Sequence, residues 1–149
     1  MEITRRAVVP GPLSAVFELV DDLGRYPTWM DLVHDVSATD VDDADGRAAW
    51  DVELQARVGP FARSKRLRMV RTVHEPPARV VFARVEVDGR QHAPWVLSAD
   101  LDDVGDGTVE VMMTLTYGGS LWTGAVLQRV LDDHVERGAA ALVELRTAS

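Results

Sequence analysis

Apolar and polar residues alternate along most of the chain, which is the pattern of β-strands with one buried and one exposed face. In one such segment Trp50, Val52 and Leu54 share a face, while the positions between them are charged or polar. The predicted strands are Glu2–Val9, Leu32–Thr39, Ala48–Val58, Phe61–Val73, Arg79–Val87, Gln91–Leu101 and Thr108–Tyr117. Short turns join most of them, and Asp88-Gly89 is a strong hairpin signal, so we expect an antiparallel sheet of sequential neighbours.

Three further segments are predicted to be helical. The longest, Gly119–Arg146, carries one apolar stripe, with His134 inside the stripe and charged residues on the opposite side. The stripe consists of Leu127, Leu131, Val135, Leu142 and Leu145. A shorter helix over Leu13–Leu23 is predicted to end at Gly24, and a second short helix is predicted to begin near Pro27.

This order of elements, β-α-α-β6-α, predicts a single α+β domain over residues 1–149. We expect a curved, seven-stranded antiparallel sheet that wraps around the long C-terminal helix. Because a strongly curved sheet and one helix do not close tightly on each other, we also expect a cavity between them. Such a cavity is the default site for a ligand.

Charge and composition narrow the possible partners. The 149 residues carry a formal net charge of −8, with a pI near 4.9. We therefore do not expect nucleic acid as a main partner, because phosphate binding needs a basic surface. No apolar run is long enough to span a membrane, and the N-terminus shows no signal-peptide pattern. These features predict a cytoplasmic protein without stable membrane insertion.

We predict neither a metal site nor a cofactor. The chain contains no cysteine, which excludes disulfides and thiolate ligands. Its histidines are too scattered for a zinc site. Asp42, Asp43 and Asp45 lack the spacing of a calcium-binding loop, so a solvated acidic turn is expected there.

The segment Val16–Trp29 has the most specific pattern in the chain. It reads Val-Phe-Glu-Leu-Val-Asp-Asp-Leu-Gly-Arg-Tyr-Pro-Thr-Trp, an apolar helix that leads into a Tyr-Pro-x-Trp turn. Together with the order of elements, it resembles the SRPBCC superfamily of START-like, birch-allergen-like and polyketide cyclase/dehydrase or coenzyme-Q-binding-like proteins. The resemblance covers nearly the whole chain and implies the helix-grip fold with a large apolar cavity. It implies no particular reaction, because this fold hosts many functions.

Three polar residues at predicted inward positions are candidates for chemistry. His134 could exchange a proton with a ligand, or it could be a core histidine bonded to the protein itself. Arg71 shares a predicted face with Met69 and Val73 and could orient a carboxylate or enolate; a β-bulge or an internal ion pair is the alternative. Tyr117 has a hydroxyl that needs a partner when buried, which a ligand or His134 could provide.

Large apolar side chains at inward positions are predicted to line the cavity, although ordinary core packing also explains them. The predicted ligand-contacting set is Trp50, Leu54, Met69, Arg71, Trp95, Leu97, Met113, Tyr117, Leu127, Leu131 and His134. Trp29, Met30 and Trp122 lie near the ends of elements, where they would form either a hydrophobic gate or a small satellite cluster.

Three functions follow from this interpretation. The first is binding of a hydrophobic small molecule, such as a lipid, an isoprenoid or a polyketide-like compound. The second is an aromatase/cyclase-type enzyme that positions a polyketide chain, with Arg71, His134 and Tyr117 in one pocket. The third is a protein-interaction module, which would have a filled interior and an exposed apolar patch. A monomer and a homodimer are both compatible with the sequence.

Overall fold

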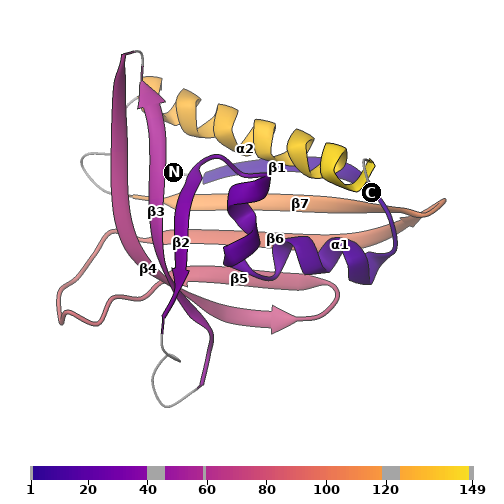
Figure 1. The fold of residues 1–149 in the computed structure, drawn as a ribbon, viewed down its shortest axis with the longest axis horizontal. Helices are drawn as coiled ribbons and strands as arrows, with labels where there is room; N and C mark the ends of the chain where they lie inside the picture. The colour runs from indigo at the N-terminus through magenta and orange to yellow at the C-terminus, as the bar shows by residue number, and fades with distance from the viewer. Residues whose placement is uncertain (1, 40–45, 59, 119–124, 148–149) are drawn as a thin grey trace.

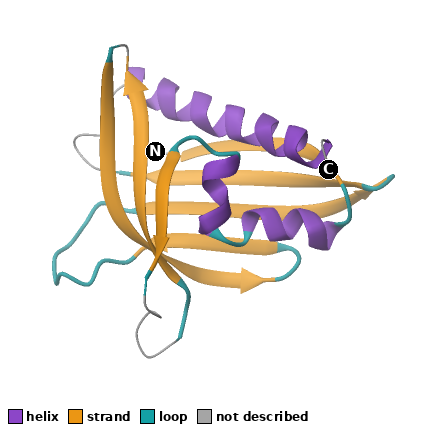
Figure 2. Cartoon of the chain, in the orientation of Figure 1, coloured by secondary structure: helices purple, strands orange, loops and turns teal. Residues whose placement is uncertain are grey.

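The computed structural model describes residues 2–39, 46–58, 60–118 and 125–147, and within them the chain forms one sheet and three helical segments (Figures 1 and 2). The strands are β1 (Glu2–Pro10), β2 (Val33–Ala38), β3 (Ala49–Val58), β4 (Phe61–Glu75), β5 (Arg79–Arg84), β6 (Trp95–Gly105) and β7 (Thr108–Tyr117). The helices are α1 (Leu13–Val20), the 3₁₀-helix η1 (Leu23–Thr28) and α2 (Ala125–Thr147). None of the described helices is long and apolar enough to cross a membrane. The acidic segment around Asp42, Asp43 and Asp45 lies outside the described residues.

The sheet curls around α2. All neighbouring strands are antiparallel, in the order β1-β7-β6-β5-β4-β3-β2. Figure 1 shows β2, β3 and β4 running almost across the direction of β5, β6 and β7. The helix α2 lies over the open side and contacts β1, β7 and β3, so it joins the two halves of the curled sheet. The predicted architecture is therefore confirmed.

The inner face of the sheet and one side of α2 form a shared apolar core. Along β7, alternate residues from Val109 to Tyr117 are buried, and the residues between them are only partly covered. On α2, Leu131, Val135 and Leu142 are completely buried. The apolar stripe predicted from the sequence is thus the side of the helix that packs against the sheet.

Polar contacts hold α2 against β1. Arg5 on β1 forms an ion pair with Asp132 on α2. Near the other end of the helix, Arg146 Nε donates a hydrogen bond to the carbonyl oxygen of Pro10 at 3.0 Å. The chain turns away at Gly11, which has a φ of 129°, and a Cβ there would lie 2.5 Å from Arg146 Nη2. Only glycine fits this turn without moving the arginine.

The first helix is shorter than predicted. It ends at Val20 instead of Leu23, and Gly24 belongs to η1 instead of terminating α1. Asp22 is the reason: its side chain accepts a hydrogen bond from the Gly24 N–H at 2.8 Å and so caps a new helix. The second short helix is present, but it begins at Leu23 and contains Pro27.

The hairpin predicted at Asp88-Gly89 is wrong. Strand β5 already ends at Arg84, and β6 begins only at Trp95, so a longer loop connects them. Within this loop His92 Nε2 lies 2.8 Å from Asp88 Oδ2, a contact that closes the loop locally. The Asp-Gly signal therefore marks a loop and not a two-residue turn.

The tight turn of this part of the sheet joins β6 to β7. Its central residues are Asp106 and Gly107, with φ values of 56° and 71°. Two consecutive positive φ angles are typical of a type I′ turn, whose twist matches that of the flanking strands. The pair lies at the end of the predicted Asp102–Gly107 turn, because β6 extends to Gly105 instead of ending at Leu101, whereas β7 begins at Thr108 as predicted.

A β-bulge in β4 changes which side chains face inward near its end. The register shifts between Arg71 and Val73. Arg71 lies opposite Phe82, and His74 lies opposite Val80, two residues of the buried inner face. The prediction that Val73 points inward is therefore wrong, because the extra residue turns it outward and turns His74 inward.

The side chain of Tyr26 links η1 to the end of α1. Its hydroxyl donates a buried hydrogen bond to the Val20 carbonyl at 2.8 Å, and burial raises the pKa of Tyr26 far above its usual value. We expect Tyr26→Phe to lower the free energy of unfolding by about 1–3 kcal/mol, because the Val20 carbonyl loses its partner. Urea denaturation measures this. Val104→Ala, at a half-exposed site, should change stability by less than about 0.5 kcal/mol. Unchanged stability in Tyr26→Phe would contradict the assigned role of this bond.

Candidate functional site

A small apolar chamber of about 30 Å³ lies between the inner face of the sheet and α2. Its walls come from η1, the connection to β2, the strands β2, β3, β4, β6 and β7, and α2. The residues that line it are Leu23, Met30, Leu32, Val33, Val52, Leu54, Leu67, Met69, Trp95, Leu97, Leu115 and Val135. Every one of these side chains is apolar, so the chamber suits a hydrophobic group and excludes charge.

The chamber is much smaller than a usual ligand pocket. Small-molecule pockets usually measure about 300–1,000 Å³, whereas 30 Å³ holds roughly one or two water molecules. Part of its wall is formed by Met30 and Met69, and unbranched methionine side chains change shape easily. Gly138 on α2 makes room for Met30, because a Cβ at this position would lie 2.7 Å from the Met30 sulfur. Met30 therefore fills the gap between α2 and the chamber.

The residues predicted to form a gate, Trp29, Met30 and Trp122, do not all lie at the chamber wall. Trp29 is 4% exposed, and its indole N–H donates to the Leu19 carbonyl at 3.2 Å, so it is anchored in the core. Met30 is 1% exposed and lines the chamber. Trp122 lies outside the described residues. Of the two described gate residues, Met30 is the one at the chamber wall.

Part of the predicted ligand-contacting set borders the chamber. These residues are Leu54, Met69, Trp95 and Leu97. Met113 and Leu131 are buried in the surrounding core, and the side chain of Leu127 lies outside the described part of the structure. The prediction missed other lining residues, such as Val52 and Leu115, which occupy the same inner face. The alternation of apolar and polar residues identified the inner face of the sheet, but not the part of that face that borders the chamber.

Tyr117 is buried beside the chamber. It faces Trp95 across the β6–β7 pair, with ring centroids 5.4 Å apart. Burial raises the pKa of the Tyr117 hydroxyl, and the negative charge of Asp132 adds to this shift. The hydroxyl therefore stays protonated at neutral pH.

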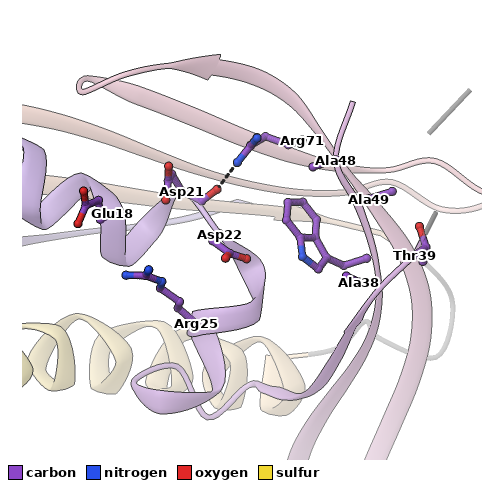
Figure 3. Close-up of a pocket in the computed structure, with 10 residues that line it drawn as sticks. Glu18, Asp21, Asp22, Arg25, Ala38, Thr39, Ala48, Ala49 and Arg71 are labelled. Carbon is purple, nitrogen blue, oxygen red and sulfur yellow. Dashed lines mark hydrogen bonds between the residues drawn. The ribbon is translucent and has the colours of Figure 1, made fainter. Parts of the chain in front are cut away.

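A second hollow is an open groove of about 530 Å³ between the α1–η1 segment and the strands β2, β3 and β4 (Figure 3). It is lined by Glu18, Asp21, Asp22, Arg25, Ala38, Thr39, Ala48, Ala49, Trp50 and Arg71. Unlike the chamber, it carries charges of both signs. Of its acidic residues, Glu18 lies in α1, whereas Asp21 and Asp22 follow directly after the end of α1, where the sequence predicted a continuous helix.

Arg71 reaches across this groove from β4 to the end of α1. Its Nη1 donates to the Asp21 carbonyl at 2.8 Å (Figure 3), and its guanidinium lies 5.9 Å from the centre of the Trp50 ring. His74, which the bulge turns inward, stacks on Phe17 and places Nε2 3.3 Å from Asp21 Oδ2. The bond from Arg71 thus holds the C-terminal end of α1.

His134 borders a third hollow, a cleft of about 380 Å³ between α2 and β3. The cleft is lined by Asp31, His34, Gln55, Arg57, Val130, Asp133, His134 and Arg137. His134 is 6% exposed, and its Nδ1 lies 2.6 Å from Asp31 Oδ1. Arg137 Nη2 donates to the other oxygen of Asp31 at 3.2 Å. His134 is thus paired with the protein itself, at the wall of this cleft and not of the chamber.

The three candidate catalytic residues do not share a pocket. Arg71 lines the groove near α1, His134 lines the cleft between α2 and β3, and Tyr117 packs in the core beside Trp95. The enzyme hypothesis requires them to meet around one substrate. The catalytic arrangement predicted from these three residues is therefore not formed.

Most of the chain matches a known protein family. A sequence model of the family described as "Polyketide cyclase / dehydrase and lipid transport" matches residues 9–143. The chain belongs to this family. The match runs from the end of β1 into α2, and it confirms the SRPBCC relationship predicted from the segment Val16–Trp29. The sequence matches no curated protein with significance.

Solved structures share the fold at low sequence identity. A START superfamily protein from Mycobacterium smegmatis is 13% identical with a TM-score of 0.74, over 99% of this chain and 97% of that one. The protein TTHA0849 from Thermus thermophilus is 19% identical with a TM-score of 0.73, over 99% and 98%. The Zhui aromatase/cyclase from Streptomyces sp. R1128 is 10% identical with a TM-score of 0.68, over 99% and 93%. At these identities the likeness establishes the helix-grip fold alone.

The contact between Gly138 and Met30 predicts strong coupling between the two positions. In the wild-type background, the methyl group of Gly138→Ala must displace the end of Met30, which offsets much of the helix-propensity gain of about 1 kcal/mol. In a Met30→Ala background the full gain of about 1 kcal/mol should appear. Urea unfolding of the four proteins measures the coupling energy. Ala140→Gly, at an exposed α2 site, should act equally in both backgrounds. Equal effects of Gly138→Ala in the two backgrounds would show that the contact is unimportant.

The hydrogen bond from Arg71 to the end of α1 gives another prediction. We expect Arg71→Gln to lower the free energy of unfolding by about 1–2 kcal/mol, because a helix-end carbonyl loses a charged donor. Amide hydrogen exchange should also become faster in α1 than in β7. Arg25→Gln, in the same groove, is the matched control and should change stability by less than about 0.5 kcal/mol. Equal effects of the two substitutions would contradict the role assigned to Arg71.

Proposed function

We propose that this protein binds a hydrophobic small molecule in the chamber between the sheet and α2. The ligand class is a lipid, an isoprenoid or a polyketide-like compound, and the protein acts as its carrier or binding module. The observation that carries the proposal is the wholly apolar lining, which comes from both halves of the curled sheet and from α2. Membership of a family described by polyketide cyclase/dehydrase and lipid transport supports it.

Binding requires the chamber to expand. A ligand that removes about 250 Å² of apolar surface from water gains roughly 6 kcal/mol, whereas repacking of core side chains costs about 1–3 kcal/mol. The balance therefore favours opening for a ligand of moderate size. Met30 and Met69 are the side chains whose movement enlarges the chamber with the smallest change in backbone.

The other two hypotheses have weaker support. An aromatase/cyclase-type enzyme is the alternative within the same family, but Arg71, His134 and Tyr117 lie apart. A protein-interaction module would need a contiguous apolar surface. The exposed large apolar residues of the described chain are spread over β1, the start of β4, the β5–β6 loop and the end of β6. They are Val8, Phe61, Val87 and Val104.

The proposal predicts that the freshly purified protein carries a ligand. Native mass spectrometry should show a bound species, and solvent extraction should release an apolar compound with that mass. A polyketide in the extract would fit both the carrier function and the enzyme hypothesis, and only its chemical conversion by the protein would favour the enzyme. A protein with only its own mass, even after incubation with a lipid extract, would contradict the carrier function.

Two matched variants test whether the ligand occupies the chamber. Met69 lines the chamber, whereas Met112 lies on the opposite face of the sheet and is only partly buried. We expect Met69→Trp to fill the chamber and abolish the bound species, and Met112→Trp to retain it. Circular dichroism confirms that each variant is folded, since overpacking costs about 1–3 kcal/mol. Loss of the ligand from both variants, or from neither, would place the binding site elsewhere.

A further inference from the structure

The polar cleft and the apolar chamber lie on the two sides of one wall. The segment 30–34 contributes to both hollows. Met30, Leu32 and Val33 line the chamber, whereas Asp31 and His34 line the cleft. The wall continues in β3 and in α2, where neighbouring residues also face opposite sides. There Leu54 and Val135 face the chamber, and their neighbours Gln55 and His134 face the cleft. A ligand in the chamber is therefore separated from the cleft by the thickness of a single layer of residues.

Met30 is the movable part of this wall. Its sulfur and methyl carbon lie against Gly138, at distances of 2.7 Å and 2.9 Å from where a Cβ would be. Gly138 follows His134 by four residues, so the two share one face of α2. The flexible end of Met30 therefore lies about one helical turn from the His134 ring. Its displacement, which the proposed function already requires, opens the chamber toward this ring.

The contact with Asp31 orients the imidazole of His134. The Asp31 oxygen 2.6 Å from Nδ1 is the shortest contact of the ring, and it requires a proton between the two atoms, so Nδ1 donates to Asp31. Arg137 Nη2 also lies 3.1 Å from Nδ1, but an arginine can only donate, so it pairs with Asp31 Oδ2 instead. In the neutral ring Nε2 then carries the lone pair and accepts hydrogen bonds. Within the part of the chain that the structure describes, Nε2 forms no hydrogen bond, although the residue is only 6% exposed. The ring therefore presents an oriented acceptor at the wall of the cleft.

The charges of the cleft indicate what this acceptor binds. Arg57 and Arg137 are balanced by Asp31 and Asp133, so the cleft has no net charge when its histidines are neutral. Asp31 is also engaged by Arg137 at 3.2 Å and by His134. A carboxylate or an amine gains little from such a neutral site. A neutral hydroxyl, by contrast, can donate to Nε2 and leave the charge balance unchanged.

We propose that the cleft recognises a hydroxyl group on the ligand whose apolar part occupies the chamber, with His134 Nε2 as the hydrogen-bond acceptor. Asp31 and Arg137 act as positioning residues, because they fix the orientation of the His134 ring. This inference rests on the proposed function and narrows the ligand class to hydrophobic alcohols and phenols. Gln55 and Arg57, across the cleft, offer donors to the lone pairs of the same oxygen.

A matched pair of probes tests the inference. 4-Pentylphenol and pentylbenzene differ only in the hydroxyl, and their Kd values can be measured by calorimetry for each variant. We expect His134→Phe, which keeps an aromatic ring, to weaken 4-pentylphenol binding about three- to tenfold. Pentylbenzene binding should change less than twofold. His134→Gln retains an oxygen acceptor and should recover part of the loss. His92→Phe, in the β5–β6 loop, should change neither Kd.

The outcomes separate this inference from the proposed function. If the wild-type protein binds neither probe, both this inference and the proposed function fail. If pentylbenzene binds and His134→Phe weakens the binding of both probes equally, the proposed binding in the chamber is retained and hydroxyl recognition by His134 is overturned. A second readout is the ¹⁵N signal of His134 Nε2, which should shift with 4-pentylphenol and stay in place with pentylbenzene. An unshifted Nε2 signal in the 4-pentylphenol complex would also overturn the inference.

Discussion

The structure depends on the burial of one concave sheet face by one helix. The curled sheet exposes an apolar inner surface that its own strands cannot cover, and α2 contacts β1, β7 and β3 across the opening. Leu131, Val135 and Leu142 contribute fully buried side chains, worth roughly 1.5–3 kcal/mol each. The ion pair and the hydrogen bond to β1 orient the helix, but they lie near the surface and contribute less. Hydrophobic burial therefore sets the fold, and polar contacts set the position of the helix within it.

The same constraint explains the position of the hollows. A straight helix touches a strongly curved sheet only along part of its length, so the remaining space is filled by side chains or stays open. The chamber lies under α2, where Met30 and the small Gly138 adjust the fit. The groove lies between the α1–η1 segment and the sheet, and the cleft lies between α2 and the sheet. Both are lined by charged residues. An apolar chamber with polar hollows nearby is the arrangement expected for a ligand with one polar group.

The sequence predicted the fold because burial repeats at regular intervals along it. Alternation in β3, β6 and β7 and the stripe on α2 each recur over many residues, so one irregular residue does not hide them. Local irregularities could not be read in the same way. The bulge after Arg71 adds one residue and turns His74 inward, and nothing in the composition of β4 marks it. The capping of η1 by Asp22 and the pairing of Asp31 with His134 depend on how segments meet in space. Which part of the inner face remains hollow depends on the curvature of the sheet as well.

The most direct test of the central claim is a titration of methyl-labelled methionine by NMR. Of the five methionines, Met30 and Met69 line the chamber, Met113 is buried nearby, and Met112 lies on the outer face. Addition of pentylbenzene should shift the methyl signals of Met30 and Met69 strongly and leave that of Met112 in place. Shifts confined to Met112, or no shifts at saturating ligand, would contradict a hydrophobic binding site between the sheet and the helix.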